Sequence, residues 1–284
     1  GTGGIFQPGF DLGMDYTPGM PFTDYGRTLE FVTGEAKASW KEGNTVLERS
    51  LFVSRADEVT VLRFSASGGE SVSATISLTP HDFRAVVMAE TDPGRLGIEF
   101  GNSVCTPDGF VAISGRRVDD GSVFGAVAKV IAPDGRMEVT AQRQSDAQQL
   151  RVDDADEILV LVKLFYKGET REQYERLRDD LANLPADYGK LLEKHAAVHS
   201  ELFLRASIDL DGGQQRMLSN ERLLLDAYKG VMSNALAERL YNYGRYLLIC
   251  SSDPEGLPAN LQGVWNGLYN PPWQGSFFFN ENIQ

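Results

Sequence analysis

The spacing of apolar residues changes near Lys167-Gly168, and this change limits the folds that the chain can adopt. Before it, apolar and polar residues alternate in short runs, as they do in β-strands that are buried on one face. Strands are predicted at residues 45–53, 59–65, 71–78, 109–113, 124–131, 137–141 and 158–165. Many short strands separated by turns, without helical periodicity, predict an antiparallel sandwich. The first thirty residues, rich in glycine and aromatic side chains, have no assignment.

After this change the apolar residues recur every three or four positions, which indicates amphipathic helices. Thr170 and Gln173 have the spacing of a capping box, so the first helix is expected to begin there. A second helix is predicted over residues 187–202. A third helical region is predicted from Ser219, and Gly230 is a position at which it can divide into two helices.

The charge and composition of the chain exclude several classes of partner. The formal net charge is −13, and the acidic residues are spread along the chain. This balance argues against nucleic acid and anionic membranes as partners. No apolar run is long enough to predict a membrane-spanning helix. The acidic balance suits a neutral substrate. No phosphate-binding glycine loop is visible, and we expect no cofactor.

A few isolated residues could carry chemistry, but each has a simpler structural interpretation. Cys105 and Cys250 are expected to be two separate thiols in different structural layers. His195 and His199 lie four residues apart on one predicted helix, a spacing that can ligate a metal but more often belongs to a packed or solvated face. Residues 209–213 resemble a calcium loop but lack its later glutamate. We therefore predict no metal site.

The segment from residue 257 to residue 284 is rich in tryptophan, phenylalanine and asparagine and has one carboxylate, Glu281. In an extended backbone, Asn280 and Asn282 point to the same face. Two amide oxygens side by side can orient one water molecule. An amide is not basic, so a carboxylate elsewhere would have to polarise the pair. The alternative interpretation is a loop whose asparagines cap backbone groups.

The aromatic residues of the same segment are candidates for binding a sugar. Aromatic faces stack on the apolar C–H faces of sugars, and neighbouring amides can satisfy the hydroxyls. We predict that Trp265, Trp273 and Phe278 bind substrate. The alternative is a packed loop whose tryptophan N–H groups find partners within the protein.

Three stretches of this segment resemble the signature of glycoside hydrolase family 95, the family of inverting α-L-fucosidases with some α-L-galactosidases. They are LPANLQGVWN at 257–266, NPPW at 270–273 and NENIQ at 280–284. The similarity extends upstream to residues 244–249 and 207–210, and more weakly to residues 25–30. The chain departs from the family pattern in Glu281, where an apolar residue is usual, and in the three phenylalanines at 277–279, which stand where smaller or polar residues are common.

The resemblance implies a multi-domain architecture. Residues 1–168 would form an N-terminal β-super-sandwich, residues 169–218 a helical linker, and residues 219–284 the incomplete start of an (α/α)₆ catalytic barrel. Asn280 and Asn282 would hold the catalytic water. The family's general acid, and the aspartate that polarises the asparagines, lie further along its barrel. We therefore expect no hydrolase activity from these 284 residues by themselves.

The function that the resemblance implies is release of terminal α-L-fucose from glycans with inversion of configuration. A secreted or periplasmic location is expected, although no signal peptide is visible in the chain. Two other classes stay open. One is a non-catalytic carbohydrate-binding module, and the other is a related (α/α)₆ enzyme with a different sugar, such as an α-L-galactosidase or a phosphorylase.

Overall fold

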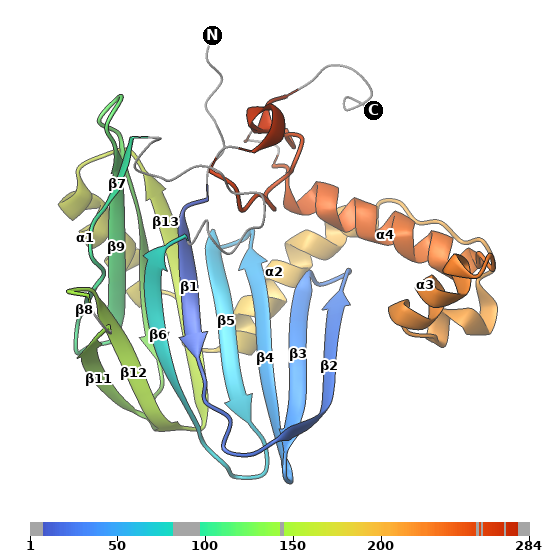
Figure 1. Cartoon of the computed structure of the whole chain (residues 1–284), viewed down its shortest axis with the longest axis horizontal. Helices are drawn as coiled ribbons and strands as arrows, with labels where there is room; N and C mark the ends of the chain where they lie inside the picture. Colours follow the sequence, from blue (N-terminus) through green and yellow to red (C-terminus); the bar gives the residue numbers. More distant parts are fainter. Residues whose placement is uncertain are drawn as a thin grey trace.

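The computed structural model describes residues 8–81, 97–142, 145–253, 256, 258–269 and 271–277. Two antiparallel β-sheets face each other in this part of the chain, and helices lie behind the larger sheet (Figure 1). The smaller sheet has the strand order β1-β6-β12-β11. The larger sheet has the order β2-β3-β4-β5-β13-β10-β9-β7, and β8 pairs with β9. The predicted N-terminal β-sandwich is confirmed at this level.

The described strands are β1 (Phe10–Asp15), β2 (Phe22–Glu30), β3 (Glu35–Glu42), β4 (Thr45–Ser54), β5 (Val59–Ala66), β6 (Val72–Pro80), β7 (Ile98–Phe100), β8 (Val104–Cys105), β9 (Phe110–Arg117), β10 (Val123–Ile131), β11 (Arg136–Ala141), β12 (Gln148–Ala155) and β13 (Glu157–Tyr166). The described α-helices are α1 (Thr170–Ala182), α2 (Tyr188–Phe203), α3 (Asn220–Tyr228) and α4 (Asn234–Cys250), with 3₁₀ turns η3 (Gly213–Met217) and η4 (Pro272–Gly275). No helix in the described part of the chain combines the length and apolarity that a membrane crossing requires.

The larger sheet contributes side chains to a hydrophobic core on each of its faces, and strand β13 contributes to both. Ile158, Val160 and other residues of the same parity pack toward the smaller sheet. Leu159 and Leu161, which point the opposite way, pack toward the helices. Successive side chains of a strand point to opposite faces, so a central strand covered on both faces is almost continuously apolar. This is why the sequence of β13 has a run of apolar residues rather than a clean alternation.

Helices α1 and α2 cover the outer face of the larger sheet. Leu181 of α1 and Leu191 of α2 pack in one buried cluster with Phe52 and Val61 of the sheet. Each of these four side chains is at most 2% exposed. Burying a side chain of this size contributes about 1.5–3 kcal/mol, so the helices and the sheet stabilise each other as one unit.

The helix boundaries agree with the sequence prediction except at the first cap. The Glu169 side chain, rather than Thr170, caps α1 by accepting a hydrogen bond from the Glu172 backbone N–H at 2.9 Å. Glu169 has extended backbone angles and can therefore reach the free N–H groups of the first turn. Thr170 is already helical, so the expected capping box does not form.

The helical region after residue 218 divides in two. Ser219 caps α3, and Ser233 caps α4. Between them Gly230 has a φ of +87°, which glycine adopts without the steric cost that other residues pay. Arg245 of α4 attaches this pair to α2, because its guanidinium donates to the backbone oxygens of Leu202 and Phe203 at 3.1 and 3.0 Å.

Candidate active site

The described part of the candidate segment, residues 258–269 and 271–277, follows α4 and lies above the upper ends of β1 and β6 (Figure 1). The turn between β4 and β5 also lies at this end of the sandwich. Two side chains of the β-domain hold this region: Arg55 contacts the stretch just before the segment, and His81 contacts the segment itself.

The first point of attachment is Arg55, in the turn after β4. Its guanidinium donates hydrogen bonds to the backbone oxygens of Ile249 and Ser252, the second at 2.7 Å, and pairs with the Asp253 carboxylate at 3.1 Å. The last carbonyl groups of a helix have no partners within the helix, and a cation there also suits the helix dipole. Arg55 therefore fixes the C-terminal end of α4, where the candidate segment begins.

The second point of attachment is His81, the residue after β6. Its Nδ1 lies 2.7 Å from Asp11 Oδ1 on β1, and its Nε2 lies 2.9 Å from the backbone oxygen of Gly267. Tyr269 is 2% exposed, and its hydroxyl donates to the backbone oxygen of His81 at 3.3 Å. The Tyr269 ring also meets Phe100 of β7 edge to face. The hydrogen bonds His81–Gly267 and Tyr269–His81 thus join residues 267–269 to the β-domain.

Within the segment, residues 260–262 lie against residues 272–276. The Leu261 backbone N–H donates to Ser276 O at 3.4 Å, and the Gln262 side chain donates to Pro272 O at 3.2 Å. Buried polar atoms usually have partners, yet among the described side chains Asn260 Nδ2 and Gln262 Oε1 are buried without one. A Cβ added to Gly275 would lie 3.3 and 3.2 Å from these two atoms.

The turn η4 has an unusual backbone. Trp273, Gln274 and Gly275 have φ values of 51°, 57° and 60°, so three successive residues adopt the left-handed conformation. For the two residues other than glycine this costs about 1–2 kcal/mol each. Such strain persists only where the surrounding structure imposes it, and it is concentrated at functional sites.

The predicted site residues fall into two groups. Trp265 is 51% exposed and Trp273 is 73% exposed, so both present aromatic surface to solvent. The other three, Phe278, Asn280 and Asn282, lie outside the described residues. Asn266, by contrast, caps the backbone locally, because its side chain accepts from Leu268 N at 3.0 Å and donates to Leu268 O at 2.8 Å.

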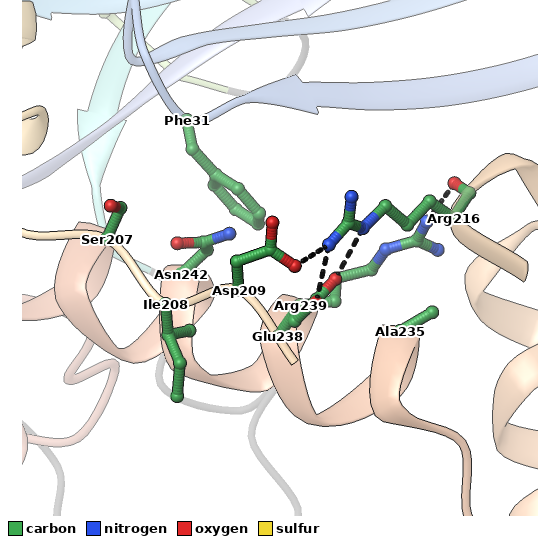
Figure 2. A pocket seen from close by; sticks show the side chains of 9 residues that line it. All are labelled: Phe31, Ser207, Ile208, Asp209, Arg216, Ala235, Glu238, Arg239 and Asn242. Atoms are coloured by element: carbon green, nitrogen blue, oxygen red, sulfur yellow. Dashed lines mark hydrogen bonds and ion pairs between the residues drawn. The ribbon is translucent and has the colours of Figure 1, made fainter. Parts of the chain in front are cut away.

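A separate hollow of about 480 Å³ lies beside α4 (Figure 2). Its polar wall is a closed ion-pair network in which Arg216 donates to Glu238 and Asp209. Glu238 also accepts the backbone N–H groups of Leu210 and Gly212. The hydrogen bond from Arg216 is the main reason that the pKa of Glu238 falls to about 2. The stretch 209–213 is therefore held by protein groups, and neither candidate tryptophan lines the hollow.

His195 and His199 lie on α2 and pack against the β-domain. His195 stacks on Phe52 with ring centroids 5.1 Å apart, and its Nδ1 accepts the Arg55 backbone N–H at 3.3 Å. His199 donates from Nε2 to the Phe31 backbone oxygen at 3.0 Å. Burial, with a smaller contribution from His199, lowers the pKa of His195 to about 4. These contacts are those of a packed helix face.

Two further predictions can be compared with the described residues. Cys105 and Cys250 are both free thiols, which confirms that prediction. In the part of the chain that the structure describes, no three His, Cys, Asp or Glu side chains are grouped as metal ligands. The contacts of Arg55, Asp11 and His81 were not predicted, because residues separated by 70 or more positions in the sequence give no local signal.

Comparison with known proteins relates both parts of the chain to glycoside hydrolases. Residues 2–165 match the model described as glycosyl hydrolase family 65, N-terminal domain. Residues 187–284 match the model described as glycosyl hydrolase family 95 catalytic domain. The chain carries an N-terminal domain of glycosyl hydrolase family 65, and residues 187–284 are similar to the family 95 catalytic domain. It is therefore a member of an enzyme family.

Relatives along the whole chain agree with this assignment. The chain is 28% identical to "Alpha-L-fucosidase 2" of Arabidopsis thaliana, over 92% of this chain and 33% of that protein. It is 25% identical to "Probable alpha-fucosidase A" of Aspergillus niger, over 99% of this chain and 35% of that protein. The chain thus spans about a third of the length of these relatives.

A solved structure supports the fold. The chain is similar to a "Putative kojibiose phosphorylase from human microbiome", with a TM-score of 0.57 at 10% sequence identity. The match covers 89% of this chain and 33% of that one. At this identity the likeness concerns the arrangement of the strands and helices alone.

Proposed function

We propose that the protein carrying this chain is a glycoside hydrolase that releases terminal α-L-fucose from glycans with inversion of configuration. The observation that carries this proposal is the combination of the family 95 match over residues 187–284 with relatives named as fucosidases. The exposed tryptophans of the candidate segment are compatible with a sugar as ligand, because an exposed ring can stack on a pyranose face.

The chemistry assigned to Asn280 and Asn282 is orientation of the nucleophilic water. Inversion requires an activated water on one face of the sugar and a general acid on the other, with the two carboxyl groups about 6.5–9.5 Å apart in most such enzymes. The two carboxamides accept hydrogen bonds from the water and aim it. A carboxylate that polarises them, and the general acid, would come from protein beyond these 284 residues, which by themselves would be inactive.

The sugar pocket would use Trp265, Trp273 and Phe278. The described contacts support a binding role for the tryptophans in one respect: both rings remain exposed although Tyr269, between them in sequence, is buried. Glu281 and the phenylalanines at 277–279 depart from the family pattern. For this reason a related sugar such as α-L-galactose is the main alternative substrate.

The architecture proposed for the chain has three parts: a β-super-sandwich over residues 1–168, a helical linker over 169–218, and the start of an (α/α)₆ barrel over 219–284. Large apolar side chains of α3 and α4 support the last assignment. Leu225, Tyr228, Leu240 and Leu248 are each more than half exposed. Apolar helix faces of this size normally pack against further helices, as they would in a barrel.

A secreted or periplasmic location is also proposed, because complex fucosylated glycans are found mainly outside the cytoplasm. The measurement is fractionation of cells that express the intact protein at its native level. Recovery in the medium or the periplasm supports the proposal. Recovery with cytosolic markers would reject it.

The proposed activity can be tested with a panel of aryl glycosides and the intact protein. Turnover is expected on the α-L-fucoside, and it should not depend on added phosphate. A preference for the α-L-galactoside would favour the related specificity, and dependence on phosphate would indicate a phosphorylase. Carbohydrate binding without turnover of any glycoside would favour the binding-module alternative.

The role of Asn282 predicts a large kinetic effect. Replacing it with glycine removes one of the two groups that orient the water, so kcat should fall by about 10²-fold or more. Asn183→Gly is the matched control, because Asn183 is exposed at the end of α1. It should retain normal activity. An Asn282→Gly variant with near-normal kcat would remove the assigned role.

A further inference from the structure

The β-domain makes a polar contact with the candidate segment that the chemistry above does not use. We propose that His81, oriented by Asp11, is a positioning residue for the reaction: it fixes residues 267–269, in the stretch of sequence that precedes Asn280 and Asn282. This inference rests on the proposed function. It assigns the small sheet of the sandwich a part in turnover as well as in folding.

The geometry at His81 is that of an oriented imidazole. Asp11 and His81 lie at the same end of the paired strands β1 and β6, where Asp11 is opposite Thr79. The ring has an oxygen at each nitrogen, Asp11 Oδ1 at 2.7 Å and Gly267 O at 2.9 Å. The carboxylate sets the orientation of the ring, and the ring in turn sets the position of Gly267. The His81 side chain is only 18% exposed, so water competes weakly for these contacts.

A second contact makes the attachment rigid. The Tyr269 hydroxyl donates to the backbone oxygen of His81, while the His81 ring contacts Gly267. The residue after β6 is thus bonded at two positions, Gly267 and Tyr269, which restricts the movement of residues 267–269 relative to that strand. The buried Tyr269 ring adds packing against Phe100. A loop held in this way has a single position relative to the strands.

Two prolines restrict the backbone shortly after this attachment. Pro271 and Pro272 follow Tyr269 closely, and proline fixes its own φ. The left-handed turn of η4 comes next, and it is held by the contacts of residues 260–262. Asn280 follows Tyr269 by eleven residues. A displacement of about 1 Å at a reacting group can lower the rate by 10²-fold. A loose attachment at Gly267 would therefore lower kcat.

A structural role alone predicts a different outcome from a positioning role. If His81 only contributed to folding, its loss would lower the melting temperature and the folded fraction, and each folded molecule would keep its normal kcat. If His81 positions the segment, its loss lowers kcat in fully folded enzyme and leaves KM nearly unchanged. It also raises hydrogen exchange in residues 261–277 without changing exchange in β6 and β13.

The experiment compares the intact wild-type protein with His81→Ala and His81→Gln. On an aryl α-L-fucoside, His81→Ala should lose about tenfold or more in kcat, with KM within about twofold. The glutamine amide keeps a donor for Gly267 O, so His81→Gln should recover most of the lost rate. Arg136→Ala is the control, because Arg136 forms an exposed ion pair with Asp154 on the same small sheet. Its kcat and its hydrogen exchange should match the wild type.

The outcomes separate the inference from the proposed function. A wild-type protein without turnover would overturn the proposed function and the inference with it. An active wild type together with a fully active His81→Ala would overturn the inference alone. Loss of kcat in parallel with the folded fraction would assign His81 a structural role and would likewise overturn the inference.

Discussion

At the scale of single residues, burial decides what the histidines do. His195 is 2% exposed and His199 is 1% exposed, and both rings use their nitrogens on backbone groups of the β-domain. His81 is only partly buried and contacts a loop. The same residue type therefore serves packing at one position and attachment at the other. Sequence spacing drew attention to the packed pair and gave no indication of His81.

The burial of His195 predicts a dependence of stability on pH. Its pKa is about 4 in the folded protein, against about 6.5 when exposed, so the unfolded chain binds the proton more readily. The free energy of unfolding should be highest above about pH 6.5 and should fall as the pH drops toward 4. The contribution of this ring is at most about 3 kcal/mol.

A denaturant titration of wild type and His195→Gln at pH 7.5 and pH 4.5 measures this effect. Glutamine does not titrate, so the stability difference between the two proteins should shrink at the lower pH. A difference that stays the same at both values would show that His195 does not carry the effect.

At the scale of elements, Arg55 joins the β4–β5 turn to the end of α4. Three oxygens accept from or pair with its guanidinium, whose side chain is only 16% exposed. Removing it leaves buried carbonyl groups without a donor. Hydrogen bonds to charged groups contribute about 1.5–3 kcal/mol. Arg55→Ala should therefore lower the free energy of unfolding by about 2–3 kcal/mol.

Chemical denaturation of three variants checks the Arg55 prediction. Arg55→Lys keeps the charge but loses the forked geometry, so it should fall between wild type and Arg55→Ala. The exposed ion pair of Arg136 should contribute less than about 1 kcal/mol, which makes Arg136→Ala a suitable reference. An Arg55→Ala protein as stable as this reference would show that Arg55 does not stabilise the C-terminal end of α4.

The elements that could be predicted from the sequence are those with strong local patterns. Strands β4, β5, β10 and β13 have runs of β-branched or apolar residues, and the helices have clear apolar spacing. Strand β2 was not predicted, because it is almost wholly exposed and therefore lacks an apolar face. Strand β3 has few apolar residues, and Glu35 and Lys37 on one of its faces form an ion pair with each other.

The candidate site was predictable only in part. The aromatic and asparagine-rich segment is visible in the sequence because its members are contiguous. Its attachment was not visible, because Arg55 and His81 meet it from positions almost 200 residues earlier. Sheet order is equally non-local, since β6 pairs with β1 and β12 rather than with its neighbour β5. Long-range contacts of this kind depend on packing that no local pattern reports.

At the scale of the whole molecule, the sandwich serves as a support for the candidate segment. Arg55 holds the chain just before the segment, and His81 holds the segment at Gly267. The β4–β5 turn and the end of β6, from which these residues come, lie at the same end of the β-domain (Figure 1). Large apolar side chains of α3 and α4, such as Leu225 and Leu248, are exposed. The family 65 and family 95 matches fall on consecutive parts of the chain, residues 2–165 and 187–284.

The roles assigned to Asn280 and Asn282 require inversion of configuration at the anomeric carbon. The direct measurement is proton NMR of the intact protein acting on an aryl α-L-fucoside, recorded before the released sugar equilibrates between its anomers. Attack by a water that Asn280 and Asn282 orient predicts β-L-fucose as the first product. Appearance of α-L-fucose first would mean retention through a covalent intermediate and would contradict the roles assigned to both asparagines.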